Sequence, residues 1–95
     1  MSHAPKIILQ LPLSNPGGLA DFVEACLRDR VVLIAVVGAN ASEVHDQIDE
    51  LIVSDGADAG RFILTSFHID ETLEEVLAFA KILEPESAGI EFVRL

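Results

Sequence analysis

A histidine that follows two hydroxyl side chains is the feature of this sequence best suited to chemistry. In the segment Thr65-Ser-Phe-His-Ile-Asp70, His68 has two hydroxyls before it and a carboxylate after it. An imidazole in such surroundings can act as a general base near neutral pH. However, neighbours in sequence seldom converge into a Ser-His-Asp site, and the Gly-x-Ser-x-Gly motif is absent. We therefore favour a structural role for His68, in ordering the start of the next helix, over a hydrolase-like site.

Two further candidates for chemistry are weaker. Cys26 falls on the apolar stripe of a predicted helix, which indicates a buried and inert thiol. His45 and Asp49 are four residues apart, a spacing that can share a metal ion, but a third ligand is missing and we expect a surface ion pair. The glycine-rich motifs of nucleotide sites are also absent. We therefore predict no catalytic residue, metal or cofactor.

Polar residues gather in three segments that follow apolar runs. In an open parallel sheet, ligands bind at the carboxyl ends of the strands, where such segments meet helix amino termini. Their amides and hydroxyls could hold a small molecule or an anion, although an inert domain would need the same residues as helix caps. The candidate crevice comprises Ser14, Asn15, Gly17, Gly38, Asn40, Ser42, Thr65, Ser66, His68 and Asp70, with Glu71 beside them.

The elements that would position these residues alternate along the chain. Four apolar, strand-like runs, Lys6–Leu13, Arg30–Gly38, Arg61–Phe67 and Gly89–Leu95, are separated by three stretches with helical spacing of apolar residues. Strands joined by helices run parallel. We predict a single α/β domain over residues 1–95, with one four-stranded, mostly parallel sheet in the order βαβαβαβ and helices on both faces, a three-layer sandwich.

The strand order follows from charge and hydropathy. Val31–Val37 is apolar on both faces and belongs inside the sheet, whereas Glu91 and Arg94 mark the last strand as a protected edge. These features favour the order 3-2-1-4. The order 2-1-3-4 is the alternative, because right-handed crossovers permit both.

Composition limits the kinds of partner. Sixteen acidic and six basic side chains give a net charge of −10, which disfavours nucleic acid and anionic membranes. An acidic surface could attract a basic protein or peptide, although it also serves solubility. The longest apolar run is too short to span a bilayer, no signal segment precedes it, and the one cysteine fits a reducing compartment. We expect a cytoplasmic protein with residues 1–5 loosely ordered.

A further signal lies in the stretch from Leu51 to Phe62, which continues through Thr65-Ser-Phe-His68 and Glu71–Val76. With these residues, about half of the chain resembles a small bacterial α/β family of uncharacterised function. The resemblance implies a standalone bacterial domain and supplies no substrate or catalytic residue.

The apolar excess without a motif favours a non-catalytic interaction or accessory domain. The chain is 51% hydrophobic, and Phe79 and Ile82 fall outside the apolar stripe of their helix. We expect a homodimer that forms through these residues or through a strand edge, with a further protein partner as a second possibility. The alternatives are a small-molecule or anion-binding module at the strand-end crevice, and a hydrolase-like enzyme that uses His68 with Ser66 or Asp70.

Overall fold

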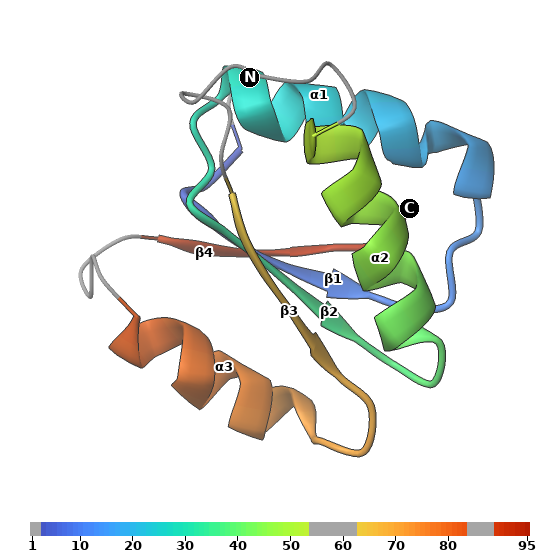
Figure 1. The fold of residues 1–95 in the computed structure, drawn as a ribbon. Coiled ribbons are helices and arrows are strands. Elements are labelled where there is room, and N and C mark those ends of the chain that lie inside the picture. The colour runs from blue at the N-terminus through green and yellow to red at the C-terminus, as the bar shows by residue number, and fades with distance from the viewer. Residues whose placement is uncertain (1–2, 54–62, 84–88) are drawn as a thin grey trace.

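The computed structural model describes residues 3–53, 63–83 and 89–95. Strands and helices alternate along the chain as predicted (Figure 1). The elements are β1 (Lys6–Gln10), the 3-10 turn η1 (Pro16–Gly18), α1 (Leu19–Arg28), β2 (Leu33–Val37), α2 (Ala41–Val53), β3 (Leu64–His68), α3 (Leu73–Ile82) and β4 (Ile90–Val93).

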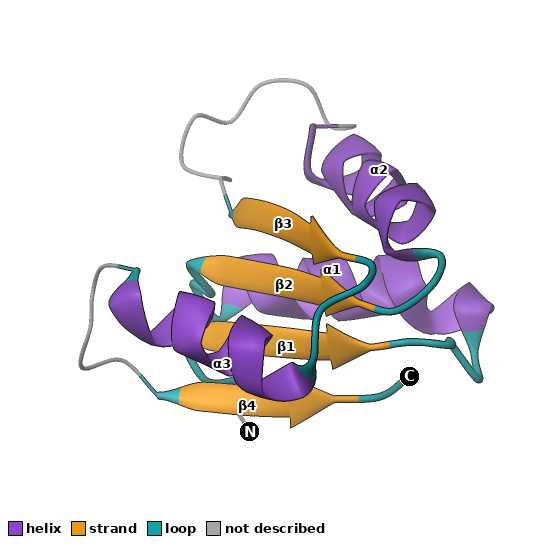
Figure 2. Ribbon diagram, turned by 90° about the horizontal axis from the view of Figure 1, so that it is seen from below, coloured by secondary structure: helices purple, strands orange, loops and turns teal. Residues whose placement is uncertain are grey.

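The four strands form one parallel sheet in the order β3-β2-β1-β4, which confirms the order that we favoured. Apolar β2 lies inside, and β3 and β4 form the two edges (Figure 2). The strands are shorter than the apolar runs, because the flanking residues turn into loops. Positions 61 and 62, at the predicted start of the third strand, lie outside the described residues.

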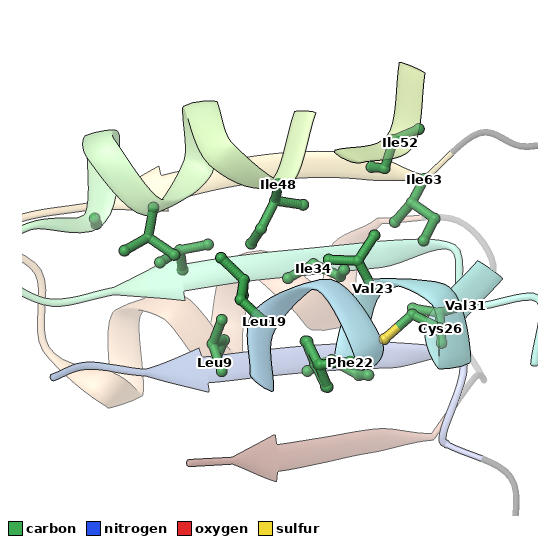
Figure 3. Close-up of a cluster of buried hydrophobic side chains, with 14 residues drawn as sticks. Leu9, Leu19, Phe22, Val23, Cys26, Val31, Ile34, Ile48, Ile52 and Ile63 are labelled. Carbon is green, nitrogen blue, oxygen red and sulfur yellow. The ribbon is translucent and has the colours of Figure 1, made fainter. Parts of the chain in front are cut away.

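Helices cover both faces of the sheet, as the alternating side chains of the strands require. Ile7 and Leu9 of β1 point toward α1 and α2, whereas Ile8 points toward α3. Figure 3 shows the larger of the two cores, where side chains of α1 and α2 meet those of β1 and β2. Cys26 lies fully buried in this core, as its position in the helix predicts.

A buried lysine joins β1 to the end of α3. Lys6 is fully buried on the α3 face, and its Nζ donates hydrogen bonds of 2.6 Å to the carbonyl oxygens of Ala80 and Leu83. The last carbonyls of a helix have no partner within the helix and carry partial negative charge. Lys6 therefore caps α3 from a neighbouring strand, a role that its place in an apolar run did not reveal.

The helix starts agree with the sequence in one case and differ in another. Thr72 and Glu75, which have the spacing typical of a capping box, form one at the start of α3. By contrast, Asn15 followed by Pro16 is typical of the start of a helix, but α1 does not begin there. Instead, η1 comes first, and Gly18 precedes α1 without a side-chain cap. None of the helices in residues 3–53, 63–83 and 89–95 has the length and apolar character needed to cross a membrane.

Candidate functional site

The three polar loops of the predicted crevice lie at the same end of the sheet (Figure 2). In the first loop, the N–H groups of Ser14 and Asn15 both donate to the main-chain oxygen of Leu95. Gly17 lies in η1. The Ser14 and Asn15 amides are thus bound to the chain itself.

The residues of the second loop are also used by the fold itself. Gly38 has a φ of +141°, and its N–H donates to the carbonyl oxygen of His68 at 3.0 Å. Asn40 precedes α2, and Ser42 lies in its first turn. Of these three residues, only Asn40 lines a nearby cavity of about 500 Å³. Its walls are Leu11, Pro12, Leu13, Ala39, Asn40, Glu43, Val44 and Gln47.

The third group of candidates divides between the two faces of β3. Thr65 pairs with Ile34 of the larger core and faces α2, whereas Ser66 pairs with Ala35 and faces α3. His68 is the last residue of β3 and not a loop residue. Asp70 is exposed in the segment that follows. The structure therefore joins Ser66 to His68 but separates both from Thr65.

Ser66, His68 and Glu71 form a continuous chain of hydrogen bonds on the α3 face. The Ser66 Oγ lies 2.9 Å from His68 Nε2, and His68 Nδ1 lies 2.8 Å from Glu71 Oε2. His68 is only 6% exposed, and its ring centroid is 5.0 Å from that of Phe79. The carboxylate that contacts the imidazole is Glu71, three residues on, instead of the expected Asp70.

Thr65 joins a second polar cluster on the opposite face. Its Oγ1 donates to Asp49 Oδ1 at 2.6 Å and lies 3.0 Å from His45 Nε2. His45 and Asp49, for which we expected a surface ion pair, do lie close together: His45 Nε2 is 3.6 Å from Asp49 Oδ2, with the Thr65 hydroxyl beside them. These residues border a cavity of about 490 Å³ between α2 and β3, lined by His45, Asp49, Glu50, Ile52, Ile63, Leu64 and Thr65.

The two edges of the sheet differ in their protection. At the β4 edge, Glu91 accepts a hydrogen bond from the Ala4 N–H and approaches His3, so a carboxylate and the chain near the amino terminus lie there. β3 contains no Asp, Glu, Lys or Arg. Its Leu64 and Phe67 side chains are 43% and 46% exposed. The predicted order 3-2-1-4 places this strand at an edge, and its lack of charged residues can be read directly from the sequence.

The two candidate interface residues of α3 have different surroundings. Phe79 is partly buried, packs against the smaller core and contacts the His68 ring. Ile82 is 72% exposed near the end of α3. Only Ile82 therefore presents most of its surface to solvent.

The buried thiol of Cys26 is unreactive for a physical reason. Burial, together with the negative charges of Asp29 and Glu91, raises the pKa of Cys26 from 9.0 to about 12. The nucleophilic thiolate is therefore scarce at neutral pH.

The chain belongs to a family described as a domain of unknown function, DUF7684, whose model matches residues 12–90. This range contains β2, β3 and all three helices, and with them both polar clusters of β3. No curated protein and no solved structure matches the chain.

Proposed function

We propose that this domain is an interaction module that binds an extended segment of a partner protein as an additional strand on β3. The observation that carries the proposal is the uncharged edge of β3, which exposes Leu64 and Phe67 and pairs with no other strand among residues 3–53, 63–83 and 89–95. Natural sheets usually protect an edge with charges, proline or a covering segment, because unpaired backbone groups recruit other strands. An edge without such charges suits a docking strand.

The backbone of β3 supplies the hydrogen bonds for such a strand. The Leu64 N–H donates to Val32, and the His68 carbonyl accepts from Gly38, so these residues direct their backbone groups toward β2. Backbone groups alternate in direction along a strand, so those of Thr65 and Phe67 point to the open edge. Among the described residues, no strand pairs with that side of β3.

The charges beside β3 favour a basic partner. α2 carries Asp46, Asp49 and Glu50, and the segment after β3 carries Asp70 and Glu71, with no lysine or arginine in either. A partner segment with cationic side chains would complement the negative charge of these side chains. A second copy of the chain, the partner that the sequence favoured, would bring two sets of acidic side chains together at the interface.

The cavity between α2 and β3 offers a place for one of those side chains. Asp49 and Glu50 supply carboxylates, and Ile52 and Ile63 supply apolar walls. A lysine or arginine has an apolar stem and a charged end, so its two parts match the two kinds of wall. In an added strand, alternate side chains face the cavity, which would give the docking its specificity.

A peptide titration tests the proposal. The probe is a fluorescent peptide of about eight alternating lysine and valine residues, long enough for one strand. Phe67→Lys places a cation on the open edge, and Phe92→Lys is the matched control, because Phe92 is equally exposed at 46% on the other edge strand. Both variants change the net charge equally, so a difference between them reports the position.

We expect Phe67→Lys to weaken the peptide's affinity at least tenfold, or about 1.4 kcal/mol, and Phe92→Lys to leave it nearly unchanged. Equal losses in the two variants, or no binding by the wild type, would refute docking at β3. Sedimentation of the protein alone is measured in parallel. A wild-type dimer that Phe67→Lys dissociates would replace the basic partner with a second copy.

A further inference from the structure

The Ser66, His68 and Glu71 cluster connects a hydroxyl, an imidazole and a carboxylate in the order that a serine nucleophile requires. The two links measure 2.9 Å and 2.8 Å, both within ordinary hydrogen-bond distance. A nucleophile within reach of a base, with the base held by a third group, is the arrangement that activates serine in unrelated folds.

The direction of each hydrogen bond follows from the chemistry of the partners. An ionised carboxylate only accepts, so Glu71 takes the proton of His68 Nδ1. In a neutral imidazole, Nε2 is then left as the acceptor, and it faces the Ser66 hydroxyl. His68 is therefore in the tautomer that can remove the serine proton. The Phe79 ring, 5.0 Å away, helps to hold the imidazole in this orientation.

The cluster on the other face of β3 has the same kinds of group in a different order. Thr65 Oγ1 donates its own proton directly to Asp49. The Thr65 proton is therefore directed at a carboxylate and not at His45 Nε2, which lies 3.0 Å from the same oxygen, while His45 Nδ1 lies 3.3 Å from Asp46 Oδ1. In this second cluster the carboxylate binds the hydroxyl directly, which makes Thr65 a comparison for Ser66.

From this geometry we infer that Ser66 is a nucleophile for acyl transfer, with His68 as its general base and Glu71 as the group that orients His68. The Ser66 oxygen attacks an ester carbonyl while His68 Nε2 takes the serine proton. The alcohol then leaves with that proton, and an acyl-serine remains. Water attacks the acyl-serine with His68 again as base, which releases the acid and restores the serine.

The surroundings of Ser66 indicate the class of substrate. The side chain is partly exposed at an edge strand, and the exposed Leu64 lies two residues before it on the same face. The N–H of Phe67, the residue after the nucleophile, points to the open edge and can donate to the developing oxyanion, as the corresponding amide does in other serine hydrolases. These features fit a small activated ester with an apolar acyl group.

A fluorophosphonate probe tests this inference on the intact protein. The serine oxygen displaces fluoride from phosphorus, so an activated serine gains a stable phosphonyl group that mass spectrometry locates. We expect an adduct on Ser66 that Ser66→Ala abolishes. His68→Gln should slow the labelling by about 10² or more, and Glu71→Gln by at least about tenfold. The matched control, His45→Gln, should leave the rate unchanged.

Several outcomes would overturn the inference. These are the absence of an adduct on Ser66, equal labelling of other serines, and equal rates in Glu71→Gln and the wild type. Thermal unfolding of each variant is recorded, and if His68→Gln is unfolded, the decision rests on Glu71→Gln, whose side chain is 43% exposed. Both proposals use the Phe67 N–H, but they are tested separately, because the labelling reports the Ser66 hydroxyl and the Phe67→Lys and Phe92→Lys titration does not involve it.

Discussion

Replacing Lys6 with methionine tests whether the buried ammonium holds the end of α3. Methionine keeps an apolar stem of similar length but cannot donate to the carbonyls of Ala80 and Leu83, which now accept at 2.6 Å. Hydrogen bonds from a charged group contribute about 1.5–3 kcal/mol each, and a buried carbonyl without a partner costs about 1–3 kcal/mol. Methionine avoids the free-energy cost of burying a charged ammonium, which offsets part of this loss.

The balance predicts that Lys6→Met lowers the free energy of unfolding by about 2–4 kcal/mol. In a chain of 95 residues, each kcal/mol lowers the midpoint of thermal unfolding by about 4–8 °C. Urea unfolding followed by circular dichroism measures the free energy directly. Lys81→Met is the matched control, because Lys81 is exposed in the last turn of the same helix and should contribute only a few tenths of a kcal/mol.

Equal stability of Lys6→Met and Lys81→Met would refute this reasoning. It would mean that burial of the ammonium costs as much free energy as its two hydrogen bonds return. A variant more stable than the wild type would refute it more strongly, because a simple apolar side chain would then suit the site better.

Three further perturbations test other parts of the structure. The pKa of Cys26 is about 12 in the folded chain and 9.0 without its surroundings, so the stability linked to the neutral thiol is present below pH 9 and is lost as the pH rises toward 12. Between pH 9 and 12, the free energy of unfolding of the wild type should fall by up to about 1.4 kcal/mol per pH unit relative to that of Cys26→Ala. If the difference in free energy of unfolding between the wild type and Cys26→Ala does not vary with pH, this prediction is wrong. Gly38→Ala should destabilise the fold by about 1–3 kcal/mol in urea unfolding, because φ is +141° and the new Cβ would lie 2.7 Å from the Leu11 Cβ. An unchanged urea midpoint would argue against strain at this position. Glu50→Gln should lower the affinity for the lysine–valine peptide severalfold at low salt, whereas Asp21→Asn on α1 should leave it unchanged. Identical affinities of the two variants would show that the cavity is not part of the interface.

The architecture was predictable because its signals are local or follow from charge. An apolar β2 had to lie inside the sheet, and a last strand with Glu91 and Arg94 had to lie at an edge, which leaves few topologies. The capping box of Thr72 and Glu75 was equally readable, because both partners lie within one turn.

The parts that the sequence did not reveal depend on contacts between distant segments. Lys6 binds carbonyl oxygens more than seventy residues away, and the main-chain oxygen of Leu95 accepts hydrogen bonds from the N–H groups of Ser14 and Asn15. The choice of Glu71 over Asp70 as the partner of His68 depends on how the chain turns after β3. Hydropathy patterns specify faces and elements, but they do not specify which polar groups meet across them.

Amide hydrogen exchange along β3, measured with and without the lysine–valine peptide, is the most direct test of strand docking. We predict that the Thr65 and Phe67 amides exchange faster than those of Ser66 and His68 in the free protein, and that the peptide protects Thr65 and Phe67 selectively. Protection of both amides before the peptide is added, or peptide-induced protection at β4 with none at β3, would contradict the proposed function.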